Sequence, residues 1–258
     1  MEKRKGVLIL TEGRSGSNWL GSLATGAGLG RSGEWLGREQ SQLDPVLTDR
    51  KTYFEAAIEN GTNGSSGFCI KIFPRHLHWI NHYYNKDFIR YCRENHDVSL
   101  VLLTRNDRLR QAISFSRGLQ TEQWTSKGEK KKDADYDFDQ ICRCYFLINR
   151  SYDYWRSYTG VISEDIQHFI YEDLLDDPSP FVNHIADHFG VTHPTKLESS
   201  LTVQRDETTE KWRVRFLEEA KTRDFIDSTT PSRLPGRSPR NLIRFLRKKP
   251  LSPYPYAY

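Results

Sequence analysis

The sequence predicts an α/β fold in three layers, with helices on both faces of a central parallel sheet. Short apolar runs alternate along the chain with segments of helical pattern, as in repeated strand–helix–strand units. The runs are continuously apolar rather than alternating, which is typical of strands covered on both faces. A turn of small residues joins the first run to the first helical segment, as in P-loop-like folds.

Four strands are expected from the apolar runs, at Val7–Thr11, Phe68–Phe73, Ser99–Thr104 and Gln167–Tyr171. Helices are expected near Asn18–Thr25, Thr52–Glu59, Leu77–Glu94, Arg108–Gln123, Phe138–Tyr158 and Pro180–Phe189. The glycine- and serine-rich segment Gly61–Gly67 predicts a flexible loop, and the charged segment Ser126–Asp135 predicts an exposed excursion.

The length of 258 residues suits one large domain with an appendage. We assign residues 1–230 to the domain and residues 231–258 to a basic, proline-rich C-terminal tail. A solvated tail or an arm on a partner subunit is preferred for it over a patch for an anionic acceptor. The net charge of +4 permits an anionic ligand but does not require nucleic acid, which usually leaves a stronger and more clustered signal.

Several other classes are disfavoured by simple features of the sequence. The first apolar run, Val7–Leu10, is too short for a signal peptide, and no stretch approaches the ~20 apolar residues of a transmembrane helix. The four cysteines form no CxxC pair and are therefore a poor signal for a zinc site. Buried reduced thiols are the better interpretation. We therefore expect a cytoplasmic protein with no metal and no membrane span.

The segment Thr11–Asn18 (TEGRSGSN) is the most informative part of the chain. The small residues Ser15, Gly16 and Ser17 let backbone N–H groups surround an oxyanion, and the helix that follows from Asn18 adds the positive end of its dipole. Arg14 can add a bidentate charged contact. The segment predicts a phosphate or sulfate site, the alternative being an ordinary strand–helix turn.

Three better-known motifs are excluded. A Walker A loop needs Lys after its second Gly, but Gly16 is followed by Ser17 and Asn18. A serine-hydrolase elbow needs Gly at the position of Ser17. The sequence from Gly28 to Gly33 matches GxGxxG but follows a helix rather than a strand, so we interpret it as a loop.

A second anion contact is expected at Arg105, which follows the strand Ser99–Thr104. The carboxyl ends of parallel strands face the same crevice, so Arg105 should share a rim with the first loop. Ser114, on the next helix, could join it in holding a second phosphate. Arg108, Arg110 and Arg117 are interpreted as solvated helix charges.

Together these segments resemble the PAPS-dependent sulfotransferases, and more specifically the bacterial trehalose 2-sulfotransferase-like family, whose members sulfate glycolipids and lipopolysaccharide. The matching motifs occur in the family's order and cover most of the chain: Thr11–Leu20 (TEGRSGSNWL), Gly30 to Trp35, Asp107 to Ser114, Gln120 to Trp124, Tyr171 to Leu174, and Asp206 followed by Trp212 to Phe216.

The resemblance implies 3′-phosphoadenosine 5′-phosphosulfate (PAPS) as donor, a carbohydrate or glycolipid hydroxyl as acceptor, and release of PAP. Residues 14 to 18 would form the phosphosulfate loop, with Arg14 stabilising charge on the departing phosphate. Arg105 and Ser114 would hold the 3′-phosphate. Glu34 would be the base that takes the acceptor's proton; from the residues alone it is a surface salt-bridge partner. A homodimer is implied by analogy.

Further roles follow from the same resemblance. Lys71 would lie near the donor, Arg205 could reach the 3′-phosphate, and Trp212 could stack on the donor or pack in the core. Trp35 and Trp124 could form a platform for the sugar, with core packing the alternative for Trp124.

Several alternatives remain open. The sequence departs from the family pattern at Ser32-Gly33 and at Ile72-Phe73-Pro74, which would lie on the acceptor side. These differences argue against trehalose as the acceptor more than against sulfuryl transfer. His76, His78 and His82 offer a rival base. Other functions that fit the loop are a nucleotide-dependent phosphotransferase and a non-catalytic binder of PAP or a sulfated ligand.

Overall fold

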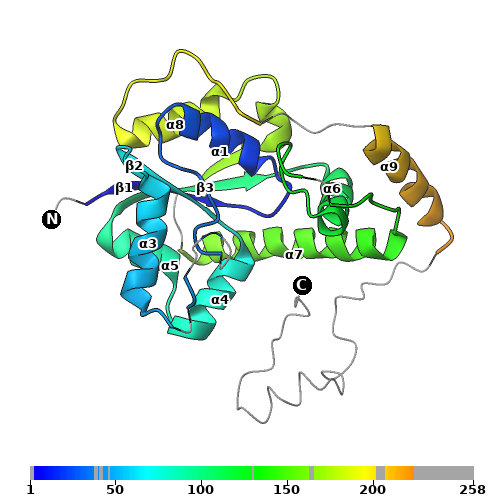
Figure 1. Ribbon diagram of the computed structural model, residues 1–258, viewed down its shortest axis with the longest axis horizontal. Coiled ribbons are helices and arrows are strands. Elements are labelled where there is room, and N and C mark those ends of the chain that lie inside the picture. The colour runs from blue at the N-terminus through cyan, green and yellow to red at the C-terminus, as the bar shows by residue number, and fades with distance from the viewer. Residues whose placement is uncertain are drawn as a thin grey trace, which may run out of the picture.

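A parallel sheet of four strands forms the centre of the molecule (Figure 1). The computed structural model describes residues 3–37, 40, 43–45, 47–129, 131–162, 166–201 and 207–223. The strand order is β2-β1-β3-β4, with β1 at Lys5–Leu10, β2 at Gly67–Ile72, β3 at Asp97–Thr104 and β4 at Gln167–Ile170. Every pairing between neighbours is parallel, so all four strands end at the same edge. The predicted α/β fold is confirmed, and each strand lies within two residues of its expected bounds.

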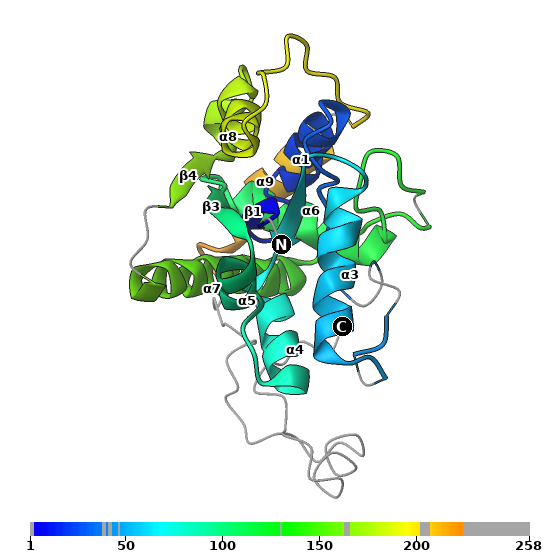
Figure 2. The same ribbon diagram turned by 90° about the vertical axis from the view of Figure 1, so that its left-hand side faces the viewer.

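Alternate side chains of the central strand enter two separate cores. Val7 and Ile9 pack with α1 (Ser17–Gly26) and α8 (Ser179–Phe189) on one face. Leu8 and Leu10 pack on the other face, with residues of the helices α3 (Arg50–Thr62), α4 (Pro74–Tyr84), α5 (Phe88–Asn95) and α7 (Phe138–Ile162). Figures 1 and 2 show these helices on opposite sides of the sheet, which gives the predicted three layers.

The single helix expected over Leu77–Glu94 is wrong, because the chain forms α4 and α5 there. The break falls at Asn85, whose φ of +49° ends α4 in the left-handed region that Asn tolerates. Asp87 then caps α5, its carboxylate accepting the N–H groups of Ile89 and Arg90. The apolar pattern continues across both helices, so periodicity alone did not reveal the break.

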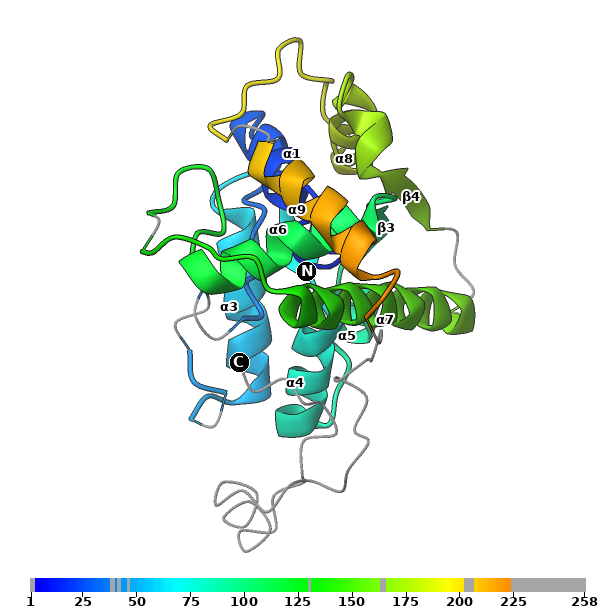
Figure 3. The same ribbon diagram turned by 90° about the vertical axis from the view of Figure 1, so that its right-hand side faces the viewer.

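After β3, the described chain contains the helices α6 (Arg108–Thr121), α7, α8 and α9 (Glu207–Glu219). Helix α6 begins after the cap Asp107 and packs along α7. Helix α9, which was not expected from the sequence, lies across α6 (Figure 3). It buries only Trp212 and Phe216, which explains its weak apolar pattern. A 3-10 turn, η1 (Tyr171–Leu174), follows β4.

Three further expectations concern the cysteines, membrane spans and the division into domains. The four cysteines are unpaired and buried, as predicted. Within the described ranges, no helix combines the length and the apolar character needed to cross a bilayer. The tail at 231–258 lies outside the described residues, so the proposed domain division stays a prediction.

Trp155 of α7 forms a hydrogen bond to the residue that follows the central strand. Its side chain is fully buried, and its indole N–H donates to the carbonyl of Thr11 at 2.8 Å. The N–H of Thr11 donates to the carbonyl of Ile72 at 3.0 Å. Both backbone groups of Thr11 are therefore held by neighbours from other elements, which fixes the point at which the chain leaves the sheet.

We expect Trp155→Phe to lower the free energy of unfolding by about 2–4 kcal/mol, because it leaves a cavity and an unpaired buried carbonyl. Trp79→Phe is the matched control, since the buried indole N–H of Trp79 has no hydrogen-bond partner among the described residues. Urea denaturation of both variants measures the difference. Equal losses would show that the hydrogen bond to Thr11 contributes nothing.

Candidate active site

Polar side chains from all four strand ends converge at the carboxyl edge of the sheet. β1 continues into the turn at residues 11–16, and β2 carries Lys71 next to its last residue. Arg105 directly follows β3, and Glu172 lies in η1 after β4. The predicted convergence of the first loop and Arg105 on one rim is therefore confirmed, and this is where ligands bind in open α/β sheets.

The turn after β1 is bent by two residues with positive φ, Arg14 at +63° and Gly16 at +86°. The Thr11 hydroxyl donates to the carbonyl of Leu103 at 2.7 Å and lies 2.8 Å from the Ser15 hydroxyl. Helix α1 begins at Ser17, so the N–H groups of its first turn have no acceptor within the helix. This geometry is suited to an oxyanion.

Arg14 lies in an environment that opposes its own charge. Its Nε donates to the Ser114 hydroxyl at 2.7 Å, and its Nη1 donates to the Trp124 carbonyl at 2.6 Å. Burial, and then the charges of Arg105 and Arg117, lower the pKa of Arg14 to about 10. The guanidinium remains charged at neutral pH, so a bound anion would relieve this repulsion.

Arg105 stands beside the same turn. Its Nη1 donates to the carbonyl of Arg14 at 3.1 Å, and its guanidinium lies 4.9 Å from the centre of the Tyr171 ring. Its Nε lies 3.6 Å from the Glu172 carboxylate and makes no hydrogen bond among the described residues. Glu172 itself accepts the N–H groups of Asn106 and Asp107. Arg105 thus places a guanidinium group directly beside the turn.

Arg117 also belongs to this cluster and is not the solvated helix charge that was expected. It is half-buried, and its Nη1 donates to the Thr209 hydroxyl of α9 at 2.8 Å. Arg108 and Arg110 are likewise half-buried: Arg108 lies 3.7 Å from the centre of the Tyr152 ring, and Arg110 pairs with Glu210. Packing between α6, α7 and α9 explains these positions.

A second group of predicted residues meets on the β2 side of the turn. Lys71 is buried, and its ammonium donates to the side-chain carbonyl of Asn18 at the start of α1. It lies 3.9 Å from the Glu34 carboxylate. Burial is the main cause that lowers the pKa of Lys71, and Glu34 opposes it.

The position of Glu34 follows from a short backbone pairing. Gly33 bridges to Ile70 of β2, and the N–H of Lys71 donates to the carbonyl of Gly33 at 2.8 Å. Because Lys71 and Glu34 each follow a residue of this bridge, the pairing places the Glu34 carboxylate close to the Lys71 ammonium group. The side chain of Glu34 is a quarter exposed, so it remains accessible.

Glu12 and Arg75 join this group and were missed from the sequence. One terminal nitrogen of Arg75 lies 2.8 Å from the Glu12 carboxylate, and the other lies 3.5 Å from Glu34. The available signal was the presence of an acidic residue inside a predicted anion-binding loop. Its partner lies 63 residues further along the chain, which local patterns do not reveal.

The three candidate tryptophans lie in different surroundings. Trp35 is buried and donates its indole N–H to the carbonyl of Arg31 at 2.8 Å. Trp124 is exposed to 40% and packs edge-on against Phe115. Trp212 lies on the buried face of α9, edge-on to the ring of Tyr136. Their assignments to donor or sugar stay predictions, as does that of Arg205, which lies outside the described residues.

The three histidines proposed as rival bases also differ in environment. His76 is buried and stacked on Phe73, and its Nδ1 accepts the N–H of Phe73 at 3.3 Å. Burial, with help from the charges of Arg75 and Lys71, holds the pKa of His76 well below its usual value. His78 packs against Tyr154, and His82 is exposed on α4.

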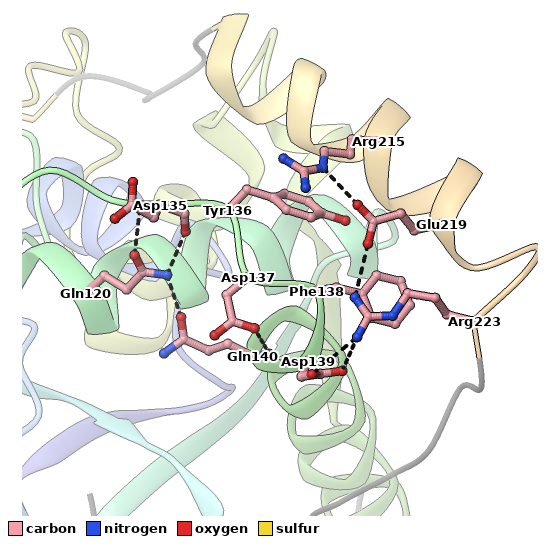
Figure 4. Close-up of a pocket in the computed structure, with 10 residues that line it drawn as sticks. All are labelled: Gln120, Asp135, Tyr136, Asp137, Phe138, Asp139, Gln140, Arg215, Glu219 and Arg223. Carbon is pink, nitrogen blue, oxygen red and sulfur yellow. Dashed lines mark hydrogen bonds and ion pairs between the residues drawn. The ribbon is translucent and has the colours of Figure 1, made fainter.

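A separate open cavity of about 440 Å³ lies between α6, the start of α7 and α9 (Figure 4). Its polar side chains largely pair with one another: Gln120 bonds to Gln140, and Glu219 pairs with Arg215 and Arg223. No predicted site residue lines it. We therefore place the candidate site at the sheet edge. In the described part of the chain, no three His, Cys, Asp or Glu side chains are grouped so as to hold a metal ion.

Comparison with known proteins gives three results. The sequence profile described as "Stf0 sulphotransferase" matches residues 7–219. No curated protein matches. Among solved structures, the chain is similar to the "Sulfotransferase Domain from the Synechococcus PCC 7002 Olefin Synthase", with 14% sequence identity over 96% of this chain and 95% of that chain and a TM-score of 0.34.

The tight turn gives a test of the anion site. We expect Gly16→Ala to weaken PAP binding about tenfold or more, because a Cβ there would lie 2.1 Å from the Tyr171 ring and because φ is +86°. Gly28→Ala is the control, since φ is +74° but nothing lies within 4 Å of its Cβ. Calorimetric titration with PAP should show unchanged affinity in Gly28→Ala; equal weakening in both variants would remove the turn from the site.

Proposed function

The chain belongs to the Stf0 sulphotransferase family, and we propose that it transfers the sulfuryl group of PAPS to a hydroxyl of a carbohydrate or glycolipid, releasing PAP. A trehalose-like sugar is one such acceptor. The proposal is carried by the convergence of two arginines on the turn after β1. The Nη1 of Arg105 donates to the carbonyl of Arg14 at 3.1 Å, and burial, followed by the charges of Arg105 and Arg117, lowers the pKa of Arg14 to about 10. A donor with phosphates at both its 3′ and 5′ positions matches a site with two separate arginine contacts.

The chemistry would divide between two groups of residues. The acceptor oxygen forms a bond to sulfur while the bond from sulfur to the 5′-phosphate oxygen breaks, and the hydroxyl proton passes to the Glu34 carboxylate. Negative charge develops on the departing phosphate. The N–H groups of the turn, Arg14 and Lys71 would stabilise that charge without reorganising.

The contact between Asn18 and Lys71 supports this arrangement. Asn18 lies in the first turn of α1, at the exit of the anion-binding turn, and it accepts a hydrogen bond from Lys71. Lys71 in turn lies 3.9 Å from Glu34. A sulfuryl group bound at the turn would thus have an ammonium group and a carboxylate on its acceptor side.

Glu34 suits the role of base better than its neighbours. Glu12 is only 2% exposed and already accepts three hydrogen bonds, so its oxygens are occupied. His76 is buried and uses Nδ1 to accept a backbone N–H. Glu34 keeps a quarter of its side chain exposed and has the ammonium group of Lys71 3.9 Å away.

Two other functions stay alternatives in the proposal. A nucleotide-dependent phosphotransferase is disfavoured because Ser17 and Asn18 replace the lysine and hydroxyl residue of a Walker A loop. A non-catalytic binder of PAP would need the anion site but not Glu34. The free cysteines support a cytoplasmic location, and a homodimer is proposed by analogy with related enzymes.

Substitution of Arg105 tests whether the donor carries a 3′-phosphate. PAP should raise the melting temperature of the wild-type protein more than adenosine 5′-phosphosulfate does, since bound ligand stabilises the native state. Arg105→Ala should weaken PAP by about 10- to 100-fold, the loss expected for a charge-assisted contact, and should affect adenosine 5′-phosphosulfate far less. Equal losses for both ligands would contradict a 3′-phosphate role, and a larger stabilisation by ATP would favour the phosphotransferase.

Glu34→Gln tests catalysis separately from binding. We expect turnover of [35S]PAPS with a panel of sugar and glycolipid acceptors to fall by about 100-fold or more, because the acceptor's proton loses its base. Affinity for PAP should change less than twofold, because the amide keeps the shape of the carboxylate. Unchanged turnover would move the base to His76 or His78.

A further inference from the structure

We propose that Glu12 and Arg75 are positioning residues for the acceptor side of the site: Glu12 anchors Arg75, and Arg75 holds the Glu34 carboxylate in place beside Lys71. The inference rests on the proposed function, in which Glu34 is the base. It assigns a role to a pair of charged residues that the donor site does not use.

Glu12 has the properties of an anchor. Its carboxylate is buried and accepts hydrogen bonds from the Gly13 N–H at 2.7 Å, the Ser151 hydroxyl at 2.7 Å and Arg75 at 2.8 Å. These donors come from the turn after β1, from α7 and from α4. A buried carboxylate with this many partners is fixed in position, since rotation would leave several polar groups unpaired.

Arg75 extends from that anchor towards Glu34. It lies in the first turn of α4, with its guanidinium 4.2 Å from the centre of the Phe73 ring. Nη1 contacts Glu12, and Nη2 lies 3.5 Å from Glu34. The planar fork of arginine can hold two carboxylates in fixed directions, which the single ammonium group of lysine cannot do.

The effect on Glu34 follows from the groups that face it. The carboxylate has Lys71 on one side at 3.9 Å and Arg75 on the other at 3.5 Å, with the neutral ring of His76 buried behind them. Its own backbone N–H donates to the Gln40 side chain. Without Arg75, Lys71 becomes the only cation beside Glu34 in this set, and the carboxylate can close onto it and turn from the acceptor. The geometry thus links Glu12 to proton transfer through two contacts.

The test uses single-turnover release of [35S]sulfate from [35S]PAPS, with water as the acceptor. The variants are Glu12→Gln and Arg75→Lys, the latter keeping the charge at a side chain that is 40% exposed and therefore unlike a core substitution. Arg90→Lys is the control, because Arg90 forms an exposed pair with Glu94 on α5. We expect about tenfold slower release in both variants, a PAP affinity within twofold of wild type, and wild-type rates in the control.

The two variants are then repeated in a Glu34→Gln background. If Glu12 and Arg75 act through Glu34, neither substitution slows release by more than about twofold there, because their effects are not additive with its loss. A tenfold further loss in that background, or a wild-type rate for Arg75→Lys, overturns the inference. No effect of Glu34→Gln alone moves the base to another residue and overturns this inference, whereas failure of the wild-type protein to bind PAP overturns the proposed function instead.

Discussion

The fixed exit of the central strand is the constraint on which the site depends. β1 is paired on both sides and its side chains fill both cores, so it cannot shift without disturbing the whole sheet. Thr11, the first residue beyond it, is held by Trp155, Ile72 and Leu103. The turn that follows therefore starts from a rigid point, and its N–H groups need little ordering when an anion arrives.

Charge is distributed unevenly on the two sides of this turn. On the β3 side, Arg105 and Arg117 lie close to Arg14, and their charges add to burial in lowering its pKa; Glu172 is the nearby carboxylate partner of Arg105. On the β2 side, Lys71 and Arg75 are matched by Glu12 and Glu34. The first side is suited to a multiply charged ligand and the second to a neutral one, which is the division that a PAPS donor and a hydroxyl acceptor would require.

The features that could be predicted from the sequence are those with a local cause. Continuous apolar runs located all four strands of the described sheet, and small residues after the first run located the tight turn that follows β1. The break at Asn85 was missed because it depends on a single left-handed residue within an unbroken apolar pattern. The contact of Arg75 with Glu12 was missed because it joins residues 63 positions apart, which only the register of β1 and β2 brings together.

Arg75 contacts two carboxylates, those of Glu12 and Glu34, which lie in different environments. Glu12 is enclosed by three donors from separate elements, so moving its carboxylate would disrupt the junction of the turn with α4 and α7. Glu34 lies in a loop next to the backbone bridge between Gly33 and Ile70, and it keeps part of its surface exposed. Glu34 thus stays open to solvent, whereas Glu12 is only 2% exposed. The proposed reaction would use this separation of a saturated anchor from an accessible carboxylate, because it gives a rigid edge for the donor and a carboxylate open to the acceptor.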